Sequence, residues 1–338
     1  MRLLVESSAA CLGHEAGPGH PERPARVVAA VQGIEAAGLG DAVVWAEPRP
    51  ATVEELALVH DARYVEALRA ICERGGGWLT IDTGAGPGSW AAALAAAGSG
   101  LDAVARLDQG EADAAFCAVR PPGHHALARA PMGFCLLNNV AVCGASLADR
   151  GERVLIVDWD AHHGNGTQDA FWSDGRVLYV SVHQAPFYPF SGAVDERGAG
   201  AGEGLTVNFP VPAGATGDVF LAALDAVGPL VRSFGPTWAV VSCGFDSHRD
   251  DDVADTALGL SAGDFAALSR QVAGLVPPGR TILFLEGGYD LDAIAASSAA
   301  CAGALVGVDV ELPAGEEPTT GGPGMDVVDE VARAGGPC

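Results

Sequence analysis

The sequence contains no lysine, so all 19 of its fixed side-chain cations are arginines, against 43 aspartates and glutamates. The formal net charge of -24 disfavours a nucleic-acid partner, because an acidic surface repels a polyanion. An acidic surface would attract cationic substrates, whereas a bias in composition would give the same charge without implying any partner. We therefore expect no nucleic acid among the partners, and both interpretations of the charge stay open.

The sequence also lacks any long uncharged apolar run. Its first six residues are too short an apolar stretch for a signal peptide, and no later segment has the character of a membrane helix. The eight cysteines include no Cys-x-x-Cys pair, which argues against a disulfide framework and a thiolate zinc site. Cys117, Cys135 and Cys243 are expected to be reduced core residues. We expect a cytoplasmic protein with no membrane partner.

Apolar, β-prone runs alternate with Ala- and Leu-rich segments, a pattern typical of an α/β protein with a parallel sheet. A chain of 338 residues, of which 49% are hydrophobic, can bury a sizeable core. We expect a single-domain open parallel sheet with helices on both faces. The predicted strands are 114–119, 154–157, 177–182, 238–242 and 281–285, and the predicted helices are 23–37, 53–74, 89–107, 138–150, 217–234, 261–275 and 291–306.

No repeat and no long linker divides the chain, so one domain is expected over residues 1–310. Residues 311–338 are rich in Gly, Pro and acidic side chains and show no face that could pack. We expect a loose C-terminal tail there, with at most a short helix at 325–334.

The segment 157–168, Val-Asp-Trp-Asp-Ala-His-His-Gly-Asn-Gly-Thr-Gln, follows a predicted buried strand. Side chains alternate along a strand, so Asp158, Asp160 and His162 would project to one side and His163 to the other. Capping of the next helix would account for a single aspartate. It accounts poorly for the whole string, because so many ionisable groups beside an apolar strand need a neutralising cation. The segment therefore predicts a metal site.

Ligands of open α/β sheets bind at the carboxyl ends of the strands, and three further predicted strands end in reactive side chains. Asp246 can join Asp160 and His162 and leave a coordination position open for water and substrate, as catalytic zinc sites require.

Proton-transfer groups follow the other two strands. The tandem pair His124 and His125 can transfer protons near neutral pH. Tyr289, after two glycines, can donate its hydroxyl to a developing oxyanion. Their joint occurrence favours an active site over surface histidines and an ordinary turn.

These strings closely resemble the histone deacetylase family, within the arginase/deacetylase fold. The residues lie nearest to the class II-like bacterial deacetylase-like amidohydrolases, with acetylpolyamine amidohydrolases among the relatives. The matches occur in family order over about residues 10–305 and comprise His20-Pro-Glu22, Arg120-Pro-Pro-Gly-His-His-Ala126, Gly133-Phe-Cys-Leu-Leu-Asn-Asn139, Asp158-Trp-Asp-Ala-His-His-Gly-Asn-Gly166, Gly244-Phe-Asp246 and Leu285-Glu-Gly-Gly-Tyr289.

The resemblance implies hydrolysis of an N-acyl amide by metal-activated water. Zinc, with Fe²⁺ as the alternative in the cell, would be held by Asp160, His162 and Asp246. His125 would act as general base and then general acid, while Tyr289 would polarise the amide carbonyl.

The resemblance also implies residues that support the two histidines. His124 would serve as an electrostatic partner, oriented by Asp158. Asn165 would attend His125 where class I members carry an aspartate, and an uncharged partner should leave His125 less basic.

Family members further bind a structural K⁺ beside the zinc. The resemblance places that ion on Ser181 and Val182, together with Asp158, Asp160 and His162. An ordinary serine at a strand end is the alternative for Ser181.

The acyl-lysine tunnel of the family has two aromatic walls, and Phe134, in the string that begins at Gly133, and Tyr188 match them. Asp82 resembles the rim aspartate that anchors the substrate backbone, although exposed loop aspartates are common. Phe190 stands where the family motif has glycine. Its ring would either reshape the rim or pack against a neighbouring loop.

Four functions compete on these residues. A zinc amidohydrolase acting on acyl-lysine or small N-acyl amines ranks first, above a dedicated acetylpolyamine amidohydrolase, because Val253 stands where polyamine-selective relatives carry glutamate. An arginase-like dimanganese ureohydrolase would need further ligands, and a non-catalytic acyl-amine binding protein would not need the full site. The expected partner is a cationic small-molecule or acyl-lysine substrate, and the sequence leaves the oligomeric state open.

Overall fold

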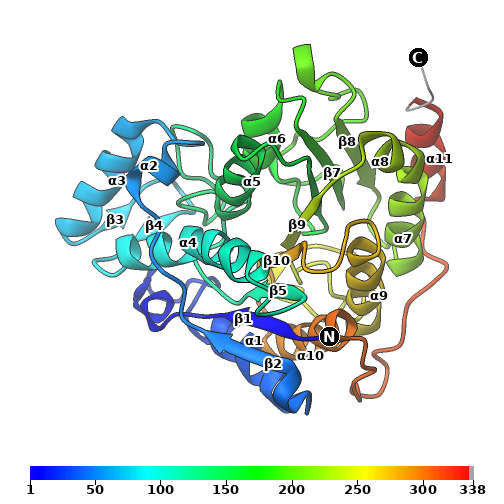
Figure 1. Ribbon diagram of the computed structural model, residues 1–338, viewed down its shortest axis with the longest axis horizontal. Coiled ribbons are helices and arrows are strands. Elements are labelled where there is room, and N and C mark those ends of the chain that lie inside the picture. The colour runs from blue at the N-terminus through cyan, green and yellow to red at the C-terminus, as the bar shows by residue number, and fades with distance from the viewer. Residues whose placement is uncertain (335–338) are drawn as a thin grey trace.

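The computed structural model describes residues 1–334, which fold around one eight-stranded sheet (Figure 1). All strand pairings in this sheet are parallel, in the order β2-β1-β5-β10-β9-β6-β7-β8. The strands are β1 (Leu3–Glu6), β2 (Val43–Ala46), β5 (Ala114–Cys117), β6 (Val154–Asp158), β7 (Val177–Gln184), β8 (Thr206–Val211), β9 (Trp238–Cys243) and β10 (Thr281–Leu285). A short antiparallel pair, β3 (Gly77–Trp78) and β4 (Gly84–Ala85), lies outside it.

Helices cover both faces of the sheet, so the predicted fold is confirmed. Successive side chains of a strand point to opposite faces, and Leu3 and Val5 belong to one apolar cluster while Leu4 belongs to another. The first cluster includes residues of α1 (Ala25–Ala36), α7 (Gly217–Ala226), α8 (Gly228–Phe234), α9 (Ala262–Ala273), α10 (Leu291–Val306) and α11 (Met325–Ala334). The second includes residues of α4 (Ser89–Asp108), α5 (Asn139–Asp149) and α6 (Asn165–Phe171).

Two predicted helices are each divided in the structure. The segment 53–74 forms α2 (Val53–Leu56) and α3 (Ala62–Glu73), because Asp61 caps the second helix by accepting from the Arg63 N–H at 2.8 Å. The segment 217–234 divides into α7 and α8 at Gly228-Pro229, since proline has no N–H to continue the ladder. All five predicted strands are present, and α10 has the predicted bounds.

Residues 311–334 pack against the rest of the fold instead of forming a loose tail, while the short helix expected at 325–334 is present as α11. Glu316 accepts from the Ala262 N–H at 2.7 Å and from His248 Nε2 at 3.0 Å. Val328 and Val331 on α11 are buried in the same cluster as the sheet. The three-residue spacing of these valines gives α11 the apolar face that composition alone concealed. Residues 335–338 lie outside the described part of the chain.

Two further expectations concern membrane-spanning helices and the cysteines. No helix within residues 1–334 is long and apolar enough to cross a membrane. Cys117, Cys135 and Cys243 are buried free thiols, as predicted.

Candidate active site

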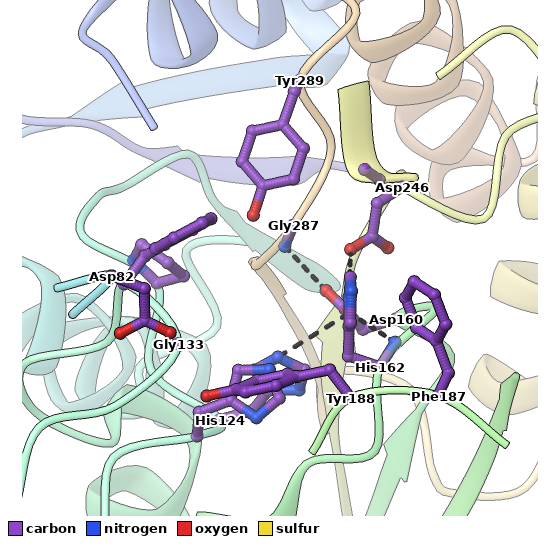
Figure 2. Close-up of a pocket in the computed structure, with 14 residues that line it drawn as sticks. Asp82, His124, Gly133, Asp160, His162, Phe187, Tyr188, Asp246, Gly287 and Tyr289 are labelled. Atoms are coloured by element: carbon purple, nitrogen blue, oxygen red, sulfur yellow. Dashed lines mark hydrogen bonds and ion pairs between the residues drawn. The ribbon is translucent and has the colours of Figure 1, made fainter. Parts of the chain in front are cut away.

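Four adjacent strands bring the predicted site residues together. β5, β10, β9 and β6 are neighbours in the sheet, and the loops at their carboxyl ends carry the tandem histidines, Tyr289, Asp246 and the Asp160–His162 segment. These loops enclose a pocket of about 220 Å³ (Figure 2). Its lining is Asp82, Pro122, His124, His125, Gly133, Phe134, Asp160, His162, Phe187, Tyr188, Asp246, Ala254, Gly287 and Tyr289.

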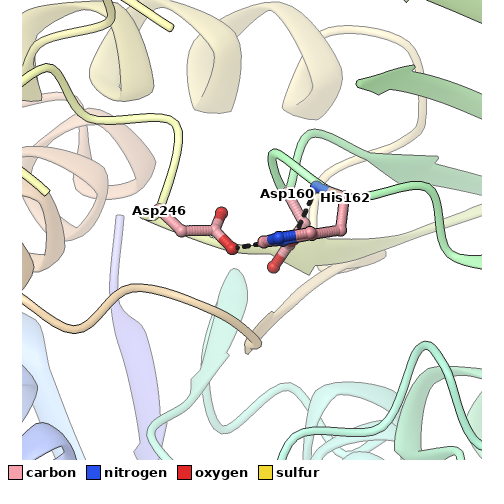
Figure 3. A group of neighbouring side chains, drawn as sticks. All are labelled: Asp160, His162 and Asp246. Atoms are coloured by element: carbon pink, nitrogen blue, oxygen red, sulfur yellow. Dashed lines mark hydrogen bonds and ion pairs between the residues drawn. The ribbon is translucent and has the colours of Figure 1, made fainter. Parts of the chain in front are cut away.

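Asp160, His162 and Asp246 form a compact group with the ligand types of a metal site (Figure 3). His162 Nδ1 lies 3.2 Å from Asp160 Oδ1 and 2.9 Å from Asp246 Oδ2. All three donor atoms lie within 4.8 Å of one another. This is the trio that the sequence predicted as ligands.

The surroundings of this group suit a cation. The Gly287 N–H donates to Asp160 Oδ2 and the Ala161 N–H donates to Asp246 Oδ1, each at 2.8 Å, so the other carboxylate oxygens stay directed at His162. A Cβ at residue 287 would lie 2.2 Å from Asp246 Oδ2, which explains the glycine.

The pKa values of Asp246 and His162 also indicate that this group of side chains favours a positive charge. Burial and the charge of Asp160 raise the pKa of Asp246 to about 7. Although burial opposes the imidazolium, hydrogen bonds to the two aspartates raise the pKa of His162 to about 10. Two buried carboxylates therefore demand a proton or a cation between them, and a divalent ion satisfies both.

The tandem histidines differ sharply in their environments. His124 Nδ1 lies 3.0 Å from Asp158 Oδ2, and its Nε2 lies 3.7 Å from Asp160 Oδ1. Although burial opposes it, the charges of Asp160 and Asp158 raise the pKa of His124 well above its ordinary value. The two carboxylates therefore favour the imidazolium form of His124.

His125 is instead held neutral. Burial first, and then the charges of His124 and His162, hold the pKa of His125 well below its ordinary value. Its Nδ1 lies 2.8 Å from Asn165 Oδ1, while Asn165 Nδ2 donates to the Met132 sulfur. Nδ1 therefore carries the proton, and Nε2 is left as a base.

Tyr289 closes the opposite side of the pocket, and Figure 2 shows its hydroxyl pointing inward. The Arg26 guanidinium lies 5.0 Å from the ring centroid and donates to the carbonyl oxygens of Gly288 and Glu286. The backbone N–H of Tyr289 donates to Asp251. Helix α1 and the loop after β9 thus fix the position of this tyrosine.

Sequence reasoning missed the buried charges behind the site. Glu286 accepts from the N–H groups of Gly123 and His124 at 2.6 and 3.2 Å, so it holds the histidine loop. Arg120 binds Glu22 through Nε at 2.7 Å and Nη2 at 2.6 Å. All three residues lie inside the motifs that resemble the histone deacetylase family, and no other feature of the sequence indicated their roles. Their contacts join segments that are far apart in the chain.

Aromatic residues form the pocket walls, as predicted. The Phe134 ring lies 5.9 Å from that of Tyr289, and the Tyr188 ring lies 5.3 Å from that of His125. Gly133 has a φ of 54°, and a Cβ there would lie 2.4 Å from the His125 ring. The sequence missed Phe187, whose ring lies 5.3 Å from that of His162.

Asp82 reaches the pocket from the loop between β3 and β4, and the Tyr188 hydroxyl lies beside its carboxylate. Of the two alternatives for Phe190, an exposed fraction of 82% favours a ring at the rim over one packed against a neighbouring loop. Val253 is also exposed, next to the pocket residue Ala254.

The residues assigned to K⁺ lie beside the metal group. Ser181 on β7 pairs with Asp158 on β6, and both Ser181 and Val182 are buried. The Ser181 hydroxyl lies 2.9 Å from His183 Nδ1. The K⁺ site stays a prediction.

The sheet and its metal-type group define a protein of the arginase/deacetylase fold, and comparison with known proteins specifies the family. The family model described as histone deacetylase domain matches residues 20–305. A probable deacetylase of Archaeoglobus fulgidus is 38% identical over 288 residues, which cover 83% of this chain and 79% of the relative. Histone deacetylase 14, chloroplastic, of Arabidopsis thaliana is 38% identical over 332 residues, with 90% and 77% covered.

A crystal structure of the HD domain of HDA15 aligns with a TM-score of 0.89 at 34% identity, covering 99% of this chain and 94% of that one. The chain therefore belongs to the histone deacetylase family. It is an amide hydrolase of the deacetylase class.

Proposed function

We propose that the protein hydrolyses N-acyl amides, a class of linear amides that includes acetyl-lysine and small N-acetylated amines. The observation that carries this proposal is the placement of His124 and His125, each hydrogen-bonded through Nδ1 to its own partner, in one pocket with Asp160, His162, Asp246 and Tyr289. Two adjacent imidazoles, one facing carboxylates and the other an amide, can supply a positive charge and a base at the same point.

Asp160, His162 and Asp246 would hold the cation, with zinc as the expected ion and Fe²⁺ as the alternative. Bound there, a divalent ion supplies a Lewis acid that activates water and polarises an amide carbonyl. Ser181 and Val182, with Asp158, Asp160 and His162, are proposed to hold a K⁺ ion that stabilises the same loops.

The chain's own residues would then move protons. His125 accepts the proton of the attacking water at Nε2 and delivers it to the leaving amine, while Asn165 keeps the proton on Nδ1. Asp158 fixes the orientation of His124. The Tyr289 hydroxyl donates to the developing oxyanion, and its raised pKa, caused by burial, keeps that hydroxyl protonated.

The pocket walls favour an acyl-lysine or a small N-acyl amine as substrate. Phe134 and Tyr188 would flank an aliphatic stem, and Asp82 at the mouth would accept a hydrogen bond from the substrate. Val253 offers no carboxylate for a polyamine nitrogen. We further propose that the protein acts in the cytoplasm and binds neither nucleic acid nor membrane.

The arginase-like alternative has little support. Within residues 1–334, one further group has metal-ligand types, namely His248, Asp250 and Glu316. His248 accepts from the Asp250 N–H at Nδ1 and contacts Glu316 through Nε2, so its hydrogen bonds are complete without an ion. The part of the chain that the structure describes holds no second such group beside Asp160, His162 and Asp246.

Substitution of Tyr289→Phe tests the mechanism. We expect turnover of an acetyl-lysine peptide to fall by about 10²–10³, because one oxyanion donor is lost. Zinc content, measured by elemental analysis, should stay at the wild-type level. Wild-type turnover in this variant would remove Tyr289 from the mechanism.

The substrate class is tested with the wild-type protein on acetyl-lysine peptide, acetylspermidine and acetylputrescine, before and after metal removal and zinc restoration. Activity confined to the acetylpolyamines would favour the dedicated polyamine enzyme. No turnover of any amide by zinc-restored protein would favour a binding protein, and two manganese ions with guanidine hydrolysis would favour the ureohydrolase.

A further inference from the structure

Phe190 has a backbone conformation that its own side chain opposes. Its φ is 64°, in the left-handed region where the Cβ of an L-residue crowds the following carbonyl. The side chain is also 82% exposed, so packing within the chain does not offset this strain. Glycine, which the family motif has at this position, would avoid both the strain and the exposed ring. Folding gives no reason for a phenylalanine here.

The backbone on both sides of Phe190 is nevertheless anchored. The Phe190 N–H donates to the Phe187 carbonyl at 2.8 Å, which closes a turn directly after the pocket wall. On the other side, the Ser191 hydroxyl lies 2.8 Å from Nδ1 of the buried His163. The segment thus connects the pocket wall at Tyr188 to an anchored residue, and Phe190 projects into solvent between them.

A second loop at the pocket exposes another large apolar side chain. Ile81 is 99% exposed, and its neighbour Asp82 lines the pocket. The Asp82 carboxylate accepts from the hydroxyls of Thr80 and Thr83 at 2.6 and 2.8 Å, so this turn is also fixed. Phe190 and Ile81 thus each leave a large apolar side chain open to a bound partner, on a loop that also contributes a pocket-lining residue.

We propose that Phe190 and Ile81 form an apolar rim that binds apolar side chains next to the acylated lysine of a polypeptide substrate. The inference rests on the proposed function, because an acyl-lysine in the pocket brings its neighbours in the polypeptide to the rim. Adjacent residues of an extended peptide lie about 3.3 Å apart along the chain, so the residues flanking the lysine stay near the pocket mouth. An acetylpolyamine has no apolar side chain to offer.

The test compares two fluorescently labelled acetyl-lysine peptides that differ only in the flanking residues, leucine in one and glycine in the other. We expect the wild-type protein to bind the leucine peptide on the order of tenfold more tightly in fluorescence anisotropy. Phe190→Gly should lose most of this preference. In turnover, its KM for the leucine peptide should rise while kcat, and KM for the glycine peptide, stay unchanged.

Two control variants separate the ring from other effects. Phe190→Asn tolerates the positive φ without the flexibility of glycine, and it should lose the preference to the same extent. Val308→Ser removes an exposed apolar side chain just after the carboxyl end of α10, whereas the Tyr289 loop precedes the amino end of that helix. This variant should keep the preference for the leucine peptide. The Tm of Phe190→Gly should equal or exceed that of the wild type, because strain is released.

Three results would overturn the rim. The first is equal binding of both peptides by the wild type, and the second is an equal loss of affinity for both peptides in Phe190→Gly. The third is a fall in the Tm of Phe190→Gly, which would show that the ring supports the fold. Failure of the proposed function is distinguishable from these. A wild type that binds the leucine peptide more tightly through Phe190, yet hydrolyses no acyl amide, would leave the rim standing and refute the hydrolase.

Discussion

The tandem histidines show how two identical side chains acquire different chemistry from their neighbours. His124 faces two carboxylates, whereas His125 faces an amide and two other imidazoles. Charge therefore favours the imidazolium form of His124 and opposes that of His125, so the two side chains are suited to different roles. The subclass residue Asn165 is part of that difference, since an aspartate there would add a negative charge at 2.8 Å from His125.

Substitution of Asn165→Asp should therefore move the acidic limb of the pH profile of kcat/KM to higher pH. The new charge raises the pKa of His125, so the base is protonated, and activity is lost, at a higher pH as the solution is acidified. Initial rates between pH 5 and 9 measure the limb. Asn165→Ala, which removes the acceptor without adding charge, should not move it upward. An unmoved limb in Asn165→Asp would mean that His125 is not the titrating base.

At this scale, sequence predicted the residues that touch the reaction better than those that support them. Asp160, His162, Asp246 and Tyr289 follow strands directly, and the carboxyl ends of parallel strands converge, so their meeting in one pocket could be inferred. Glu286 also follows a strand directly, but neither its role in holding the histidine loop nor the role of Arg26 could be inferred in this way. Both residues act through contacts to segments more than 150 residues away, which no local pattern records.

Among the elements, five of the eight strands of the large sheet were predicted, because they are continuous apolar runs. β1, β2 and β8 were missed. β1 and β2 have only four residues each, and β2 is a half-exposed edge strand without a clear pattern. Helix ends fell within one or two residues of prediction where a single helix forms, as in α4 and α9. The order of the strands in the sheet could not be predicted, because it depends on pairing between segments that are far apart in the chain.

The last helix offers a test at this scale, because α11 buries one apolar face against α7 and β8. Substitution of Val331→Asp should lower the free energy of unfolding by about 3 kcal/mol, since a charge would enter the core without a partner. Ala332→Asp places the same charge on the exposed face of the same turn and should change stability by less than about 0.5 kcal/mol. Urea denaturation of both variants measures the difference. Equal stability of the two variants would mean that α11 does not pack against the core and that the tail is loose.

For the whole molecule, the site lies at the carboxyl ends of the four central strands, beside a loop that carries acidic side chains. Asp250, Asp252 and Asp255 are exposed on the loop that also contributes Ala254 to the pocket. The field of a protein with a formal charge of -24 is strongest at low ionic strength, and clefts bordered by acidic loops concentrate cations. If these charges steer a cationic substrate, turnover of that substrate should depend on ionic strength. If they reflect only a bias in composition, it should not.

The salt dependence of turnover decides between these two origins of the charge. If the field steers substrate, kcat/KM for an acetyl-lysine peptide with two arginines should fall by about tenfold between 20 and 500 mM NaCl, because the Debye length shrinks from roughly 20 Å to about 4 Å. An uncharged peptide of the same length should change by less than about twofold. Asp252→Asn combined with Asp255→Asn should weaken the salt effect and leave kcat unchanged, since neither side chain lines the pocket. Equal salt responses of the two peptides would assign the charge to composition alone, and the substrate would then need no positive charge.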